Sequence, residues 1–164
     1  MVYRSMGVLF ENSKGTIVFT EYHENAGNWN YQLINIHTYN NISEPLINDF
    51  IEQFNLHFKV SMITIYTAEY RFIVNGASVA ASTTLPIITD LPAIDIQLGG
   101  SGEFYKSAAE KLGMTDYKMT AEEKAICIGF MGILRWREEY NFLSSVTGAS
   151  RNSIGGAIWL GQEA

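Results

Sequence analysis

The residues best suited to catalysis or ligand binding lie between positions 90 and 102, in the stretch DLPAIDIQLGGSG. Asp90 and Asp95 follow a short apolar run, residues 85–89, that is typical of a buried strand. A carboxylate can act as a general base, and ligands of open α/β sheets bind beyond the carboxyl ends of strands. The glycines that follow would let a sugar or a phosphate approach the main chain; they are Gly99, Gly100 and Gly102. The simpler interpretation is a tight connection whose aspartates cap the next helix.

The elements before this stretch should form part of a mixed sheet. Strand-forming residues over 3–10 and 15–22 flank a polar turn, and a third strand is expected over 29–39. Side chains alternate between the two faces of a strand. In the third strand, Leu33 and Asn35 should therefore lie on one face, and Ile34 and Ile36 on the other. The chain should therefore open with an antiparallel three-strand meander.

Helical and strand patterns alternate after the meander. A proline in an acidic first turn at residues 43–45 predicts a helix start, and apolar residues repeat at helical spacing as far as position 54. The following segments are expected to be strands over 60–66, 71–74 and 85–89, with a short helix over 77–82. This order predicts a mixed sheet with helices on its faces.

Two further helices are expected in the last third of the chain. The first should span residues 103–112, and a capping box of Thr120 and Glu123 predicts the start of a longer one. The longer helix is apolar nearly all round, which is typical of a buried helix. Its glycines, Gly129 and Gly132, would allow close packing against another element. An apolar tail could add an edge strand.

The composition limits the class of protein. With 164 residues, of which 47% are apolar, the chain fits one domain with a sizeable core. A net charge of −6 argues against a general nucleic-acid binder, and no apolar run approaches the roughly 20 residues of a membrane span. The three histidines do not have metal-ligand spacing, and the single cysteine, Cys127, is expected in the core. No targeting segment is recognised, so a cytoplasmic protein is expected.

Three parts of the sequence resemble the anhydro-N-acetylmuramic acid kinases of the actin-like sugar-kinase superfamily. They are residues 85–102, residues 129–160 with the run SVTGASR, and residues 2–22 with 27–34. The resemblance implies an α/β fold, a single lobe of the actin-like ATPase (ribonuclease H-like) fold, whose mixed sheet begins with the three-strand meander. Residues 1–164 would then be a single domain that resembles the first kinase lobe plus its C-terminal helix and tail, with most of the second lobe absent.

The turn that would cradle phosphate in this family departs from the family's pattern. The family has a G-T-S-x-D-G type turn where this chain reads FENSKG, so only Ser13 and Gly15 keep its character. Phe10 and Glu11 replace glycine backbone that could approach a phosphate, and Asn12 lies in the same turn. A carboxylate about 4 Å from a phosphate costs about 4 kcal/mol at an effective dielectric constant near 20. The resemblance therefore implies a degraded phosphate turn with no metal site.

Asp95 stands where the resemblance places the family's catalytic base. The glycine frame after it is kept, but Leu91, Pro92 and Ala93 replace the family's arginine segment. Between residues 113 and 120 there is only a short connection, where the family has most of its second lobe. Phosphoryl transfer depends on positioning and charge stabilisation, so one lobe should not hold both substrates in line. Asp95 would then be vestigial.

These departures predict a degenerate, non-catalytic kinase-like protein, a pseudoenzyme that acts through protein contact or small-ligand binding without a cofactor. A second copy of the chain could cover the surface left by the missing lobe, so a homodimer is expected, and a full-length kinase is another expected partner. Neither nucleic acid nor a membrane is expected as a partner.

The alternative is an enzyme. It would be an ATP-dependent phosphotransferase acting on 1,6-anhydro-N-acetylmuramic acid in amino-sugar metabolism and peptidoglycan recycling. In that case Mg-ATP would be its cofactor, and a partner chain could supply the absent lobe. The sequence leaves open whether the protein is an enzyme.

Overall fold

The computed structural model describes residues 1–41, 44–58, 60–67, 87–88, 103–114, 119–145, 153–154 and 157–158. The described elements, in chain order, are β1 (Val2–Glu11), β2 (Lys14–Asn25), β3 (Asn28–Tyr39), α1 (Glu44–Phe58), β4 (Met62–Thr67), β5 (Ile87–Ile88), α4 (Glu103–Lys111), α5 (Ala121–Ser145), β6 (Ser153–Ile154) and β7 (Ala157–Ile158). No helix among these residues is long and apolar enough to cross a membrane.

The described strands form one mixed sheet in the order β3-β2-β1-β4-β5-β7-β6. The pairs β1–β2 and β2–β3 are antiparallel, whereas β4 is parallel to both β1 and β5. The first hairpin turns through Asn12 and Ser13, whose φ angles are 53° and 61°. Positive φ at both central residues is the turn geometry that matches the twist of paired strands. The meander predicted from the sequence is therefore confirmed.

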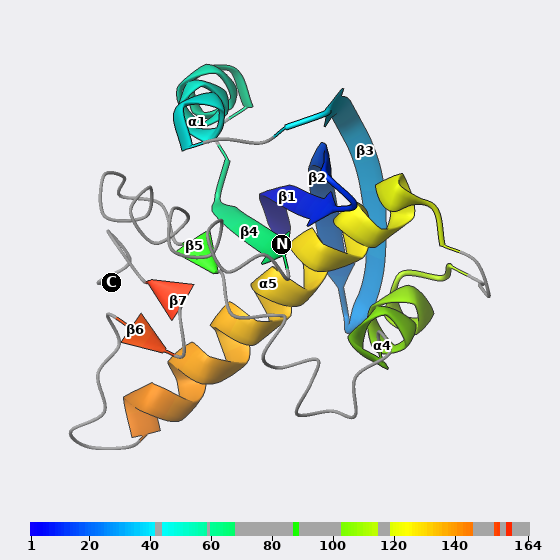
Figure 1. The fold of residues 1–164 in the computed structure, drawn as a ribbon. Helices are drawn as coiled ribbons and strands as arrows, with labels where there is room; N and C mark the ends of the chain where they lie inside the picture. Colours follow the sequence, from blue (N-terminus) through cyan, green and yellow to red (C-terminus); the bar gives the residue numbers. More distant parts are fainter. Residues whose placement is uncertain are drawn as a thin grey trace.

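Helix α5 crosses one face of the sheet over β1, β2 and β4 (Figure 1). Glycines make the close approach possible, because a Cβ atom added at Gly7 would lie 2.3 Å from the carbonyl oxygen of Ala125. A Cβ at Gly129 would lie 2.8 Å from the Tyr22 hydroxyl. That hydroxyl donates a hydrogen bond to the carbonyl oxygen of Ile126 and ties the helix to β2. The prediction of a buried helix packed closely through its glycines is confirmed.

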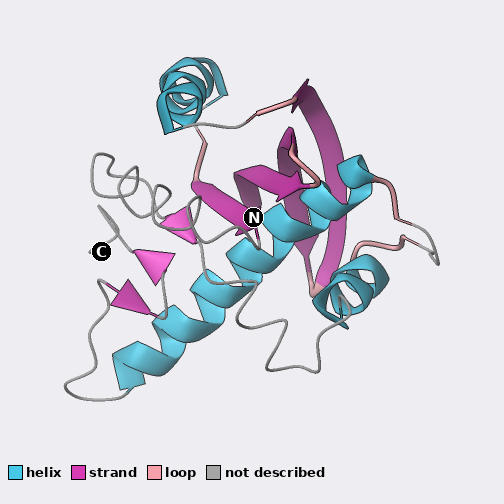
Figure 2. Cartoon of the chain, in the orientation of Figure 1, coloured by secondary structure: helices cyan, strands magenta, loops and turns pink. Residues whose placement is uncertain are grey.

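The core has two parts, one on each face of the sheet. Leu9, Val18 and Tyr22 pack with Phe130 and other residues of α5. Alternate residues of β1 and β2 instead point to the opposite face, where they pack with Phe50 and Ile51 of α1. They include Met6, Val8, Phe10, Ile17 and Phe19. Figure 2 shows the resulting arrangement, with the sheet between the long helix α5 and helix α1. Helices on both faces of the mixed sheet agree with the predicted architecture.

The predicted faces of β3 are wrong beyond its middle. The register between β2 and β3 shifts between Phe19 and Thr20, which pair with Asn35 and Leu33 and leave Ile34 as an extra residue. Because of this bulge, Leu33 and Ile36 both pack on the α5 side, while Ile34 packs on the α1 side. Simple alternation had placed Leu33 and Ile36 on opposite faces.

Candidate active site

The candidate site lies where the parallel strands β1 and β4 end. Phe10 pairs with Thr67 in this part of the sheet, and Glu11 is the last residue of β1. The strand that follows β1 in the chain, β2, lies on one side of β1 in the sheet. The strand that follows β4, β5, lies on the opposite side of the β1–β4 pair. The carboxyl ends of strands at such a reversal of strand order are where open α/β sheets bind ligands.

A cavity of about 290 Å³ opens at this position, and we call it the strand-end cavity. The β1–β2 hairpin, β3 and the start of α5 line it. Its lining residues are Glu11, Asn12, Lys14, Thr16, Thr38, Thr120, Ala121 and Glu122. The cavity therefore combines two carboxylates, one lysine and several threonine side chains, all polar groups that suit a charged ligand.

The hairpin turn positions the carboxylate of Glu11 at the cavity. Glu11 pairs with Lys14 across the two-residue turn, and Phe10 pairs with Gly15. The turn residues expected to form the degraded phosphate turn thus form a tight hairpin, in which Glu11, Asn12 and Lys14 line the cavity. The role proposed for this turn from the sequence stays a prediction.

The first turn of α5 brings the second carboxylate. The backbone NH of Glu123 donates to Oγ1 of Thr120 at 3.2 Å, and the backbone NH of Thr120 donates to Oε1 of Glu123 at 3.1 Å. This pair of bonds confirms the predicted capping box. Glu122 lies in the same turn, where the helix dipole favours a negative charge. The cap thus fixes the point at which Glu122 reaches the cavity.

Lys124 connects the two sides of the site. Its Nζ atom lies 3.3 Å from Oε1 of Glu11, and the side chains are 31% and 43% exposed, respectively. Ion pairs this exposed contribute at most about 1 kcal/mol, because water competes for both charges. The contact holds α5 against the end of β1 without closing the cavity.

Oxygen ligands of this kind suit hard divalent cations such as Mg²⁺, which is often held by one or two carboxylates while it keeps several waters. Glu11 and Glu122 fit that requirement, and Lys124 already places a positive charge beside Glu11. Within the ranges that the structure describes, no group of three or more acidic, histidine or cysteine side chains could hold a metal ion. The cavity therefore offers a two-carboxylate site at most from these residues.

The site residues predicted after β5 lie outside the described residues. This applies to the proposed base Asp95 and to the ligand-facing loop, namely Asp90, Gly99, Gly100 and Gly102. The sequence had identified Glu11 but had missed Glu122 and Lys124. In the sequence, Glu122 and Lys124 appear only as residues of a helix start. Nothing in the neighbouring sequence indicates which strand that end of the helix will face.

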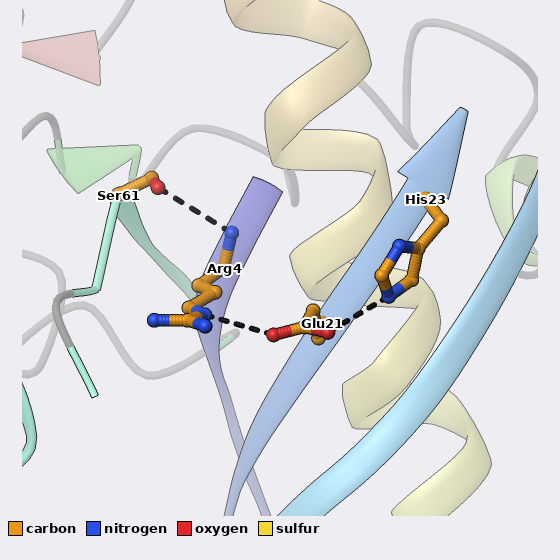
Figure 3. Close-up of polar contacts among 4 residues, drawn as sticks. All are labelled: Arg4, Glu21, His23 and Ser61. Atoms are coloured by element: carbon orange, nitrogen blue, oxygen red, sulfur yellow. Dashed lines mark hydrogen bonds and ion pairs between the residues drawn. The ribbon is translucent and has the colours of Figure 1, made fainter. Parts of the chain in front are cut away.

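A second charged cluster lies at the opposite end of β1 and β2. Figure 3 shows Glu21 between Arg4 and His23, at 2.9 Å from Arg4 Nε and 2.8 Å from His23 Nε2. The hydrogen bond from Arg4 holds the pKa of Glu21 below its ordinary value, and His23 adds to this, while partial burial opposes it. A carboxylate already paired with two bases is suited to stabilising the hairpin, so the cluster is not part of the candidate site.

Neither a family model nor a curated protein matches the sequence. The fold does match solved structures. A RuvC structure from Thermus thermophilus has a TM-score of 0.55 at 10% identity and covers 85% of this chain and 97% of that chain. T. thermophilus RuvC in complex with a Holliday junction substrate has a TM-score of 0.53 at 11% identity, with 84% and 96% covered. The likeness shows a ribonuclease H-like fold, as expected from the sequence.

The assignment to the anhydro-N-acetylmuramic acid kinases is corrected by these matches. The two structures named above are RuvC, and the match spans 97% of a RuvC chain, so a single lobe of this kind occurs as a complete fold. The kinase-like pseudoenzyme and the alternative phosphotransferase in amino-sugar metabolism and peptidoglycan recycling are therefore wrong.

The expected partners are corrected as well. The homodimer and the full-length kinase were inferred from a missing lobe, and that inference loses its basis when one lobe is a complete fold. The expectation of no nucleic acid is contradicted by the RuvC structure in complex with a Holliday junction substrate. It had relied on net charge, which averages over the whole surface and does not describe a local site.

Proposed function

We propose that this protein binds nucleic acid and hydrolyses its phosphodiester bonds at the strand-end cavity with the help of divalent metal ions. The observation that carries the proposal is the pair of carboxylates, Glu11 and Glu122, which line one cavity from the end of β1 and from the first turn of α5. The substrate class is an analogy from the fold, supported by the RuvC complex with a Holliday junction substrate.

The residues at the cavity have distinct roles in this proposal. Glu11 and Glu122 provide oxygen ligands for Mg²⁺, and Lys14 provides a positive charge for a phosphate. When bound, Mg²⁺ activates a water molecule and stabilises negative charge on the phosphate. The capping box fixes the first turn of α5, in which Glu122 lies.

Further acidic residues belong to the proposal through the order of the strands. Glu69 follows the last residue of β4 by two positions, and Asp90 follows the last residue of β5 by two positions. Both acids lie outside the described residues. Because β4 is parallel to β1 and β5 is parallel to β4, the carboxyl ends of these three strands lie at the same edge of the sheet as Glu11. Asp95, further along, stays a sequence prediction for a general base.

The net charge of −6 sets a condition on binding. A negative protein and a negative phosphate backbone repel each other unless cations lie between them. Divalent ions at Glu11 and Glu122, together with Lys14 and Lys124, would reverse the local charge. Nucleic-acid binding should therefore depend on divalent cations.

We place this activity in the cytoplasm, where the single thiol of Cys127 would stay reduced.

The proposal is tested with a fluorescently labelled Holliday junction and a linear duplex of the same length. Binding is followed by anisotropy in Mg²⁺ and again with a chelator, for the wild type and for Glu11→Gln and Glu122→Gln. We expect binding in Mg²⁺, weaker binding with the chelator and cleavage only by the wild type. Glu110→Gln is the matched control, because Glu110 lines a different cavity beside the β2–β3 turn. Absence of binding to both nucleic acids would contradict the proposal.

A further inference from the structure

Lys124 lies where the helix itself disfavours a positive charge. It is the fourth residue of α5, and its backbone NH donates to the carbonyl oxygen of the cap residue Thr120 at 2.9 Å. The amino-terminal end of a helix carries a partial positive charge, which repels an ammonium group. Glu11, with Oε1 at 3.3 Å, offsets this repulsion from the neighbouring strand.

The same contact occupies one of the two carboxylate oxygens of Glu11 with an ammonium group. The carboxylate of Glu11 is one of the two in the strand-end cavity, and Lys124 is held beside it. A divalent cation attracts a carboxylate more strongly than an ammonium group does, and at the same time it repels that ammonium group. The exposed ion pair is weak enough to be exchanged.

We propose that Lys124 is a built-in competitor for the divalent metal at Glu11 and thereby sets the metal concentration at which the site loads. This inference rests on the proposed function, because it assigns the regulation of the same cavity. Without metal, Lys124 neutralises Glu11 and holds the site at rest. With metal bound, the ammonium group leaves Glu11 and becomes available to a phosphate of the nucleic acid.

The test is a calorimetric titration of the full chain with Mn²⁺ in the absence of nucleic acid, so that it does not depend on cleavage. Four variants are compared with the wild type, namely Lys124→Met, Lys124→Arg, Glu11→Gln and Lys111→Met. The last is the matched control for loss of one positive charge, since Lys111 in α4 lines the other cavity. Thermal unfolding of each variant checks that the fold is retained.

Lys124→Met should bind Mn²⁺ about threefold to tenfold more tightly than the wild type, because the competing ion pair is lost. Lys124→Arg and Lys111→Met should stay within about twofold of the wild type. Unchanged Mn²⁺ affinity in Lys124→Met, together with lost binding in Glu11→Gln, would overturn the role of Lys124 and leave the proposed site standing. An equal gain in Lys111→Met would show a general charge effect and would also overturn it. If the wild type binds no Mn²⁺, the proposed site fails and this inference fails with it.

Discussion

Gly132 of α5 lies directly against Thr64 of β4. A Cβ atom added to Gly132 would lie 1.8 Å from Oγ1 of Thr64 and 2.9 Å from its Cβ, distances at which one of the two must move. The helix can therefore sit this low on the sheet only because residue 132 has no side chain.

Gly132→Ala should destabilise the protein by about 1–3 kcal/mol, because the added methyl group overpacks the helix–sheet contact. The better helix propensity of alanine, worth about 1 kcal/mol, offsets only part of this. Denaturant unfolding measures the difference. Gly113→Ala is an informative comparison, since its Cβ would meet nothing within 4 Å but its φ of +73° is unfavourable for alanine. Equal stability of Gly132→Ala and the wild type would refute the close contact.

Glu21 should contribute to stability in a way that depends on pH. Its folded-state pKa is lowered from the ordinary value of 4.5, first by the hydrogen bond from Arg4. A lowered pKa means that the contribution is fully present above the ordinary value and is lost as the pH falls through the folded-state pKa.

Glu21→Gln should therefore unfold more easily at neutral pH, by up to about 1 kcal/mol for so exposed a network. The difference from the wild type should vanish in acid, where the carboxyl is protonated in both states. Thermal unfolding across the acidic range measures both parts, and Glu110→Gln serves as the control. A difference that persists unchanged at low pH would show that Glu21 acts by packing and not by its charge.

Cys127 should be unreactive in the folded protein. Burial raises the pKa of its thiol to about 12, with a further contribution from the charge of Glu123. Near neutral pH almost none of it is thiolate, the form that reacts with disulfide reagents. The reaction of the single thiol with such a reagent should be slow in buffer and fast in concentrated guanidinium chloride. A fast reaction of the folded protein would mean that the end of α5 near Cys127 opens readily.

The meander and the start of α5 could be predicted because their signals are local. Hairpin turns, side-chain alternation and the Thr120–Glu123 cap each depend on a few neighbouring residues. The bulge at Ile34 could not be predicted, because it depends on how β3 pairs with β2 and leaves no mark in the sequence of β3 alone. A single extra residue was enough to change the face of Ile36.

The site was predicted only in part for a related reason. Glu11 was recognised as an unusual acid in a turn, but its contact with Lys124 joins residues that are 113 positions apart. Such a contact exists only after α5 has packed on the sheet. The family resemblance supplied the correct fold and the wrong function, since one fold supports many unrelated activities.

The proposed nuclease activity is tested most directly by the rate at which the purified chain cleaves a labelled Holliday junction in Mg²⁺, measured for the wild type and for Glu11→Gln. We expect cleavage by the wild type that stops when the metal is chelated. The rate for Glu11→Gln should be lower by at least about tenfold to a hundredfold, the loss that follows even when a group that only supports a metal ligand is removed. Equal rates for the two proteins, or a wild type that cleaves no nucleic acid in any divalent ion, would contradict the proposed activity.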